Sequence, residues 1–167
     1  MTSVSTMPFS LCMLSEDALR TIASGRAPAA YAELLERDAL PPPFVAARAL
    51  RLAAVGIPAP WSTSFLIMRH EDGRVVGGCG FKTPPLQGRV EVGYGVAPAA
   101  QQRGAATAAL GMLLELARSA GASEVLAEVA PGNLASSRVV EKAGFRRTGE
   151  RVDEDGELVA QWLRSVT

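Results

Sequence analysis

The spacing of apolar residues changes along the chain, and these changes predict its secondary structure. Short apolar runs bounded by glycine, proline or charged turn residues are typical of strands, whereas apolar residues three and four positions apart are typical of helices. The predicted strands are Pro8–Leu14, Ser62–His70, Val75–Phe81, Arg89–Val96, Glu124–Ala130, Phe145–Glu150 and Leu158–Arg164. The predicted helices are one that follows Ser15, then Tyr31–Asp38, Phe44–Val55, the segment from Ala106 to Ala117, and Asn133–Ala143. This order predicts an α+β (mixed α/β) fold, with helices packed on a mixed sheet.

Local signals mark the ends of several of these elements. Ser15 is a good N-cap, and Glu16 and Asp17 follow it in the first turn, where the helix dipole favours acidic residues. Gly121 follows the helix that contains Ala106 to Ala117, as expected of a residue that closes a helix. The strand Val75–Phe81 is unusually rich in glycine, which weakens a strand unless something approaches its backbone closely.

Length and composition indicate one folded domain that spans residues 1–167. The chain has 167 residues, of which 48% are hydrophobic and 20% charged, and this excludes a disordered chain. Its 17 basic and 17 acidic residues give a net charge of zero, so a nucleic-acid partner is not expected. No apolar run approaches the ~20 residues of a membrane span, and no secretory signal is visible at the N-terminus. The chain is therefore predicted to be cytoplasmic, without a membrane partner.

Metal chemistry is not indicated by the histidine and cysteine content. His70 is the single histidine and no CxxC pair occurs, so no metal site is predicted. Cys12 and Cys79 lie far apart inside apolar runs, which favours buried free thiols over a disulfide or a reactive pair.

The segment Gln101–Ala106 has the features of an anion site. It follows the strand Arg89–Val96 and leads into a helix whose first-turn amides have no acceptor within the helix. Gly104 and the two alanines after it would let a diphosphate reach the backbone, and Arg103 could add a charged contact. A P-loop is excluded because no GK[ST] sequence follows, and Pro98 replaces the third glycine of a dinucleotide fingerprint. An ordinary strand–helix turn that contains glycine remains the alternative.

Four segments resemble one family. Gln101-x-x-Gly104-x-Ala106 resembles the (Q/R)-x-x-G-x-(G/A) motif of the GNAT superfamily of N-acetyltransferases. Glu91–Tyr94 is similar to the strand before that motif, and Thr107–Leu110 to its helix. Residues 133–145 resemble the family's NxxSxxVxEKxGF segment. The resemblance covers roughly residues 60–165, and its NxxS form is similar to the RimJ/RimL-like branch, which acetylates the N-termini of ribosomal proteins.

This resemblance implies a GNAT-like acyl-CoA N-acyltransferase fold that binds acetyl-CoA as a cosubstrate. The central sheet would be mixed but mostly antiparallel, flanked by helices, with a V-shaped opening between the parallel strands Arg89–Val96 and Glu124–Ala130. Pantetheine would pair with backbone groups of Val96 and Ala97, and Asn133 would hydrogen-bond to it. The full set of residues implied to bind the cosubstrate is Val96, Ala97, Gln101, Gln102, Arg103, Gly104, Ala105, Ala106, Asn133 and Ser136.

Acetyl transfer to an amine needs a neutral amine and a proton for the leaving thiolate. Deprotonation at pH 7 costs about 4.6 kcal/mol for a lysine of pKa ~10.4, but about 1 kcal/mol for an α-amine of pKa ~7.8. Glu128 and Glu91 lie on the two strands of the expected opening, and each is a candidate base, directly or through water. For each, the alternative is a solvated or salt-bridged strand residue.

The acid that protonates the thiolate is harder to assign. Many family members have a tyrosine seven residues after the asparagine, where this chain has Val140. The resemblance to the NxxS branch places Ser136 near the coenzyme sulfur, with Ser137 as a weaker candidate. Alternatively, Ser136 only caps its helix. Tyr94 is interpreted as a structural residue.

The acceptor is expected to contact the helical region Tyr31–Val55, the loop Gly56–Trp61 and the turn Thr83–Gly88. Trp61 is equally compatible with an aromatic wall of the acceptor pocket and with simple packing. The loop Ala39–Phe44 has no acidic cluster, so a highly cationic acceptor is not indicated.

The predicted function is an acetyl-CoA-dependent N-acetyltransferase that acts by direct transfer in a ternary complex, as a monomer or homodimer. Its acceptor would be a protein N-terminus or a small amine. The alternatives are a non-catalytic acyl-CoA-binding regulatory module and an unrelated α+β interaction domain.

Overall fold

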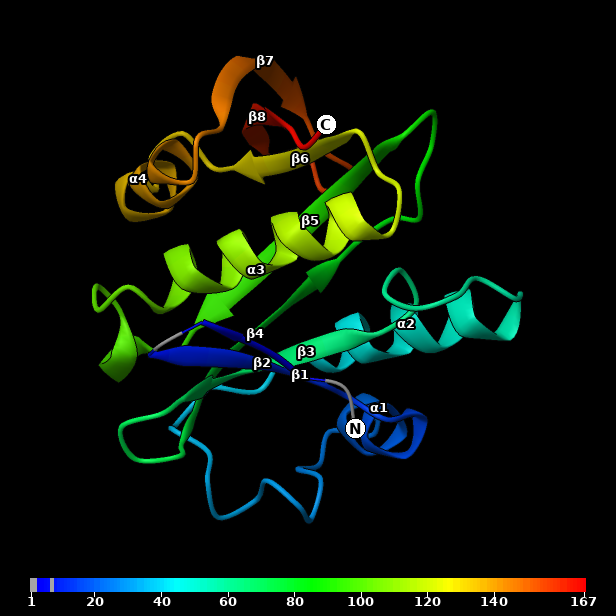
Figure 1. Cartoon of the computed structure of the whole chain (residues 1–167), viewed down its shortest axis with the longest axis vertical. Helices are drawn as coiled ribbons and strands as arrows, with labels where there is room; N and C mark the ends of the chain where they lie inside the picture. Colours follow the sequence, from blue (N-terminus) through cyan, green and yellow to red (C-terminus); the bar gives the residue numbers. More distant parts are fainter. Residues whose placement is uncertain (1–2, 7) are drawn as a thin grey trace.

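The computed structural model describes residues 3–6 and 8–167, which form one sheet with helices on its faces (Figure 1). Within these residues the sheet has eight strands in the order β1-β2-β3-β4-β5-β6-β8-β7. The strands are β1 (Ser3–Thr6), β2 (Phe9–Met13), β3 (Ser64–Arg69), β4 (Val75–Phe81), β5 (Arg89–Val96), β6 (Glu124–Val129), β7 (Arg146–Val152) and β8 (Leu158–Ser165). The helices are α1 (Glu16–Ala23), α2 (Pro43–Ala54), α3 (Ala105–Ser119), α4 (Leu134–Lys142) and a 3₁₀ turn, η1 (Pro98–Ala100).

Strands β5 and β6 run parallel, while the other neighbouring strands of the described sheet are antiparallel. Their pairing begins at Arg89 opposite Glu124 and stops at Val92 opposite Ala127. Beyond that point the second half of β5 has no strand partner on its β6 side, and the two strands diverge (Figure 1). The prediction of a mixed, mostly antiparallel sheet with a V-shaped opening is therefore confirmed.

The two faces of the sheet are covered by different helices. Helix α3 crosses one face, where Leu110 and Leu113 are fully buried together with Val90 of β5 and Val125 of β6 (Figure 1). Helices α1 and α2 pack against each other, with α2 contacting β3, and α4 contacts α3 and β6. Burial of these apolar faces supplies the main driving force for the fold.

Several predicted helix ends match the structure. The Ser15 Oγ accepts a hydrogen bond from the Ala18 N–H (3.2 Å), so Ser15 caps α1. The Asn133 side chain caps α4 in the same way, by accepting from the Ser136 N–H (3.0 Å). Helix α3 ends at Ser119, and Gly121 follows in the left-handed conformation (φ 94°), which glycine adopts without strain.

The helix predicted over Tyr31–Asp38 is wrong, because this segment pairs with a strand. Val75 of β4 donates to the Leu34 carbonyl (2.9 Å) and accepts from the Glu36 N–H (3.0 Å). The Glu36 carboxylate also binds Arg69 (3.0 Å) and Arg74 (2.9 Å). These contacts hold the backbone in an extended bridge, so tertiary pairing overrides the local helical pattern. Strand β1 was not predicted, since its sequence, Ser-Val-Ser-Thr, has too few apolar positions to show alternation.

Two smaller predictions can be checked directly. Cys12 and Cys79 are both buried, as predicted, and the Cys12 Sγ lies 3.1 Å from the Tyr31 hydroxyl. Burial raises the pKa of the Cys79 thiol far above its ordinary value, so this thiol stays protonated and unreactive at neutral pH. Among the described residues, every helix is too short or too polar to cross a bilayer.

Candidate active site

The second half of β5 presents backbone groups to the opening beside β6. The Lys82 N–H donates to the Glu91 carbonyl (2.7 Å), and the Ala97 N–H donates to the Val76 carbonyl (2.8 Å). In an antiparallel pair these bonds alternate, so the backbone groups of Tyr94 and Val96 point away from β4 and into the opening. A ligand can therefore pair with Val96 as a strand would. The backbone of Ala97 is already engaged within the protein, since its N–H donates to the Val76 carbonyl and its carbonyl accepts from the Ala100 N–H (2.9 Å).

A cavity of about 460 Å³ lies between the segment Gln101–Ala106 and helix α4, and we call it the loop cavity. Gly104 has φ 89° and precedes the first residue of α3, so the first-turn amides of α3 are not covered by a side chain at this position. The Gln101 Nε2 donates to the Val96 carbonyl (3.1 Å), which ties the segment to β5. The predicted residues that line this cavity are Val96, Gln101, Gln102, Gly104, Ala105, Ala106, Asn133 and Ser136.

The positive charges around the loop cavity come from α4 rather than from the loop. Arg138 and Lys142 line the cavity, whereas the exposed Arg103 does not. Sequence reasoning missed both residues of α4. Their spacing of four places them on the same helix face as each other, and this was the signal available in the sequence. Together with the helix terminus they make the loop cavity attractive to a phosphorylated ligand.

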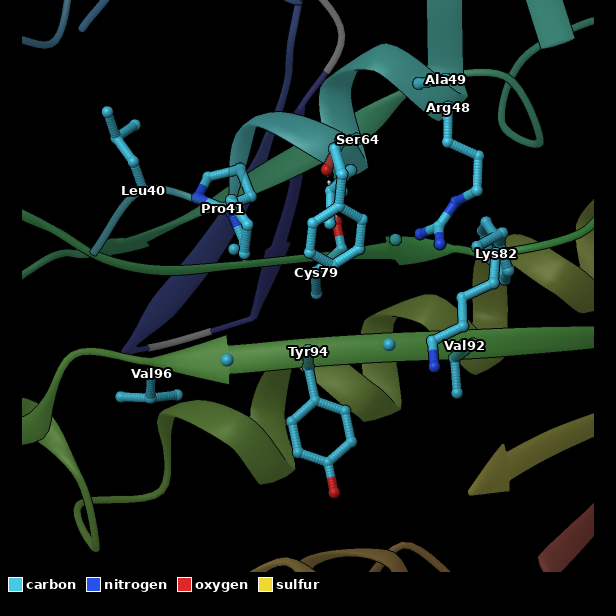
Figure 2. Close-up of a pocket in the computed structure, with 18 of the residues that line it drawn as sticks. Leu40, Pro41, Arg48, Ala49, Ser64, Cys79, Lys82, Val92, Tyr94 and Val96 are labelled. Atoms are coloured by element: carbon cyan, nitrogen blue, oxygen red, sulfur yellow. Dashed lines mark hydrogen bonds between the residues drawn. The ribbon is translucent and has the colours of Figure 1, made fainter. Parts of the chain in front are cut away.

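A second cavity, of about 500 Å³, lies under α2, and we call it the α2 cavity (Figure 2). Four glycines form its floor, because Gly78 pairs with Gly95 and Gly80 pairs with Gly93 across β4 and β5, and the Lys82 side chain lies over Gly93. Cross-strand partners share a sheet face, and a Cβ at Gly78 would meet Pro41 at 3.3 Å, which places this face on the α2 side. We call these four residues the glycine floor. They account for two of the three glycines of β4, and the third, Gly77, lies so close to the Gly95 carbonyl that a Cβ there would clash with it at 2.2 Å.

Only part of the segment expected to contact the acceptor lines the α2 cavity. Residues between Asp38 and Ala49 form its wall, including Leu40 and Pro41 (Figure 2). The loop Gly56–Trp61 and the turn Thr83–Gly88 do not line it. Trp61 is buried and makes an edge contact with the ring of Phe81 (centroids 4.8 Å apart), so its role is packing.

The loop cavity and the α2 cavity meet where β5 and β6 diverge, and they share the lining residues Tyr94, Gly95, Val96 and Ser136. Tyr94 leaves β5 on the side away from α2 (Figure 2), and its hydroxyl lies 2.7 Å from the Ser136 Oγ. Burial raises the pKa of Tyr94, and the hydrogen bond with Ser136 opposes this only in part. The phenol is therefore protonated at neutral pH, at the junction of the two cavities.

These contacts change the interpretation of both residues. The helix cap is the side chain of Asn133, not that of Ser136, whose Oγ instead meets Tyr94. Tyr94 was interpreted as structural, but its hydroxyl reaches the junction. The sequence did not reveal this pairing, since the two residues are 42 positions apart.

The two candidate glutamates are both engaged in ion pairs. Glu128 lines the α2 cavity, but its carboxylate contacts Arg151 twice (2.5 and 2.7 Å) and accepts from the Gln161 Nε2 (3.0 Å). The hydrogen bonds from Arg151 lower the pKa of Glu128, which makes it a weaker base. Glu91 lies 3.2 Å from the Lys82 Nζ and does not line the cavity. The geometry therefore favours the salt-bridged alternative for both residues.

Replacing Glu128 by Gln is expected to lower the free energy of unfolding at pH 7 by about 1–2 kcal/mol, because a charge-assisted contact is lost. The 37% exposure of Arg151 keeps the effect below that of a fully buried pair. The pKa of Glu128 is lower in the folded state than in the unfolded chain, so its stabilisation is complete above the unfolded pKa of ~4.3 and fades as the pH falls below it. Urea unfolding at pH 7 and pH 3 measures both effects.

Glu115→Gln is the matched control, since Glu115 forms an exposed pair with Arg118 one turn along α3. It should change the stability much less. A Glu128→Gln variant as stable as the wild type at pH 7 would contradict the structural role of the Arg151 pair.

The family model for the acetyltransferase (GNAT) domain matches residues 19–146, which is most of the chain. The chain belongs to the GNAT acetyltransferase family. The resemblance inferred from the motifs is thereby confirmed, and it extends further toward the N-terminus than residues 60–165. No curated protein matches the sequence significantly.

Solved structures share the fold over nearly the whole chain. A Bordetella pertussis protein assigned to the GNAT family is 27% identical, with TM-score 0.67, covering 98% of this chain and 99% of that one. A Salmonella typhimurium acetyltransferase that modifies the N-terminal serine of ribosomal protein L7/L12 is 14% identical (TM-score 0.70, coverage 99% and 100%). A Vibrio cholerae spermidine N-acetyltransferase is 16% identical (TM-score 0.67, coverage 96% and 95%). The GNAT fold is thus shared with enzymes of the expected RimL-like branch and with a polyamine acetyltransferase.

Proposed function

We propose that this GNAT protein transfers the acetyl group of acetyl-CoA directly to an α-amine, held with the cosubstrate in a ternary complex. The observation that carries the proposal is the meeting of the loop cavity and the α2 cavity at Tyr94, Gly95, Val96 and Ser136. A donor in the first cavity and an acceptor in the second reach each other there without an acyl-enzyme. Proximity of this kind accounts for much of the rate in such transfers.

The loop cavity suits the shape and charge of acetyl-CoA. The amides of Gly104, Ala105 and Ala106 would hold the pyrophosphate at the start of α3, as helix termini do. The backbone of Val96 would pair with pantetheine along the open edge of β5. The Oδ1 of Asn133 already caps α4, which leaves its Nδ2 for the pantetheine arm.

Replacing Arg138 and Lys142 together by Gln is expected to raise the Kd for acetyl-CoA about 5- to 20-fold, since each exposed charge contributes up to ~1 kcal/mol. Part of the salt dependence of binding should disappear as well. Calorimetric titration at 50 and 300 mM salt measures both. The control is Arg146→Gln, an exposed arginine outside the cavity, which should leave the Kd unchanged. Equal Kd values for the double variant and the wild type would show that α4 does not bind the phosphates.

The ion pairs of the two glutamates favour an acceptor that loses its proton easily. Glu128 is held by Arg151, whose hydrogen bonds lower its pKa and make it a weaker base, and Glu91 is held by Lys82 outside the α2 cavity. Deprotonation of an α-amine at pH 7 costs only about 1 kcal/mol, so water is a sufficient proton acceptor. Deprotonation of a lysine-type amine costs about 4.6 kcal/mol. This difference supports an N-terminal or amino-acid amine over a polyamine.

Bound acetyl-CoA would supply the thioester whose carbonyl carbon the amine attacks. As the new C–N bond forms, the C–S bond breaks and the thiolate needs a proton. The hydroxyl pair of Tyr94 and Ser136 would donate that proton at the junction, with Ser136 relaying between the phenol and the sulfur. The attacking nitrogen loses its own proton to water. Water can then return a proton to the hydroxyl pair, which regains its starting protonation state.

Coenzyme A release in the presence of an amine panel tests the proposal. N-terminal peptides and amino acids are expected to support release, with spermidine at least 10-fold less efficient in kcat/KM. Saturating acetyl-CoA should also stabilise the protein, by about 2.7 kcal/mol at 100 times its Kd. Stabilisation without amine-dependent release would instead indicate a regulatory acyl-CoA-binding module, and no stabilisation would exclude both functions.

A further inference from the structure

Arg48 differs from the other charged residues around the α2 cavity. Four charged side chains line it: Asp38, Arg48, Lys82 and Glu128. Glu128 is paired with Arg151, and Lys82 is paired with Glu91. Asp38 is exposed to solvent. Within residues 3–6 and 8–167, Arg48 makes no hydrogen bond and no ion pair within 4 Å, so among these four side chains its guanidinium is the half-buried charge without a close partner.

The position of Arg48 makes this lack of a partner costly. Its side chain is half-buried and extends from α2 toward the strands, over the cavity (Figure 2). Burial lowers the pKa of Arg48, opposed only in part by the more distant Glu91. A charge removed from water is unfavourable unless an opposite charge meets it. A ligand that brings an anionic group into the cavity would neutralise the charge of Arg48.

The shape of the guanidinium indicates which anion. Its planar fork of N–H donors matches the two oxygens of a carboxylate, which it binds in a bidentate manner. The cavity beside it has a glycine floor and an apolar wall with Leu40 and Pro41, so a carbon body of modest size fits between them. The same cavity meets the loop cavity at Ser136 and Tyr94, where the reacting amine must lie.

We propose that Arg48 binds a carboxylate of the acceptor, so that the substrate class is an amine that also carries a carboxylate. This inference rests on the proposed function, which it makes more specific. It disfavours a polyamine, since a second ammonium group would lie against Arg48 instead of a carboxylate. The carboxylate can be the α-carboxylate of a free amino acid or the acidic side chain of an N-terminal residue, and the two sources share the same chemistry.

Matched substrate pairs separate these sources. The standard amino acids are compared with their carboxamides, and peptides that begin with Asp or Glu are compared with those that begin with Asn or Gln. Spermidine is the cationic acceptor. For the wild type, the carboxylate member of at least one pair is expected to have a kcat/KM 10- to 100-fold above that of its amide. The pair that shows this preference identifies the source.

Arg48→Gln is expected to abolish that preference by lowering kcat/KM 10- to 100-fold for the carboxylate acceptor, mainly through KM, with little effect on the amide. Arg48→Lys should restore part of the preference, since the positive charge is kept while the bidentate fork is lost. Arg51→Gln is the matched control: it removes an exposed arginine from the same helix, outside the cavity, and should leave both acceptors unchanged.

Binding of the same acceptors, measured by calorimetry in the presence of coenzyme A, tests Arg48 without turnover. Equal losses for the acid and the amide in Arg48→Gln would overturn the proposal and leave Arg48 a packing residue. A wild type that prefers spermidine would overturn it as well. If acetyl-CoA binds but no amine is acetylated, the proposed function fails, while selective binding of carboxylates through Arg48 is still measured in the calorimeter.

Discussion

Replacing Tyr94 by Phe is expected to lower kcat about 100-fold while leaving the Kd for acetyl-CoA within about twofold. General acid catalysis contributes typically 10²- to 10⁴-fold, and the Tyr94 hydroxyl is a half-buried, protonated group at the junction of the two cavities. The substitution removes one oxygen and keeps the ring, so the packing of β5 should be preserved. Single-turnover and steady-state kinetics with a saturating acceptor measure the loss.

Ser136→Ala and the double variant show whether the two hydroxyls act as a unit. If the proton passes through the 2.7 Å contact, each single variant loses most of the acid function and the double variant loses little more. Losses that multiply would contradict a shared path. An unchanged kcat in Tyr94→Phe would return Tyr94 to the structural role first assigned to it.

The pH dependence provides a second test. Because the pKa of Tyr94 is raised, the phenol stays protonated throughout the range in which the acceptor amine loses its proton. In the wild type, kcat/KM should therefore rise with pH up to the amine pKa and fall only at alkaline pH, when Tyr94 ionises. Tyr94→Phe should retain the rise and lose the alkaline decline. A decline that persists in the variant would assign it to another group.

Gly95→Val is expected to stabilise the protein while lowering the acceptor kcat/KM more than 100-fold. A Cβ at Gly95 would have no heavy atom within 4 Å, and its backbone is not left-handed, so a side chain can leave the strand at this position without a clash at Cβ. Replacing a strand glycine in this way should add about 0.5–1 kcal/mol of stability. The new side chain would, however, rise from the glycine floor into the α2 cavity. Thermal unfolding and acceptor titrations measure the two effects.

Gly149→Val separates the two effects of this substitution. Gly149 lies in β7, outside both cavities, and a Cβ there also meets nothing within 4 Å. This control should change the stability without changing the acceptor kinetics. If Gly95→Val acetylates its acceptor as well as the wild type does, the acceptor does not lie on the glycine floor.

Features with local causes could be predicted from the sequence. Strand Arg89–Val96 has the predicted bounds, and α1 begins after Ser15, because alternation and capping depend on residues a few positions apart. The segment Tyr31–Asp38 shows the limit of that reasoning. Its local pattern is helical, but pairing with Val75, about 40 positions away, determines its conformation.

In the candidate site, too, the features built from consecutive residues could be predicted, and those built from distant residues could not. The segment Gln101–Ala106 could be recognised because an anion site at a helix terminus is built from consecutive residues, and the structure places a cavity beside it. The roles of Glu91 and Glu128 could not be predicted from the sequence. The arginine that binds Glu128, for example, is Arg151, which lies 23 positions further along the chain. The pairing of Tyr94 with Ser136 likewise depends on how β5 and α4 pack.

The sequence by itself determined the α+β class, the likeness to the GNAT family and the segment expected to hold acetyl-CoA, since each is encoded in short stretches whose spacing is enough. Only the tertiary structure decided which carboxylates are neutralised, that Tyr94 meets Ser136, and that a glycine floor under α2 leaves room beside the unpaired Arg48. These features bring together residues that are distant along the chain. Their chemistry depends on burial and on charged neighbours, which exist only after the sheet and helices have packed.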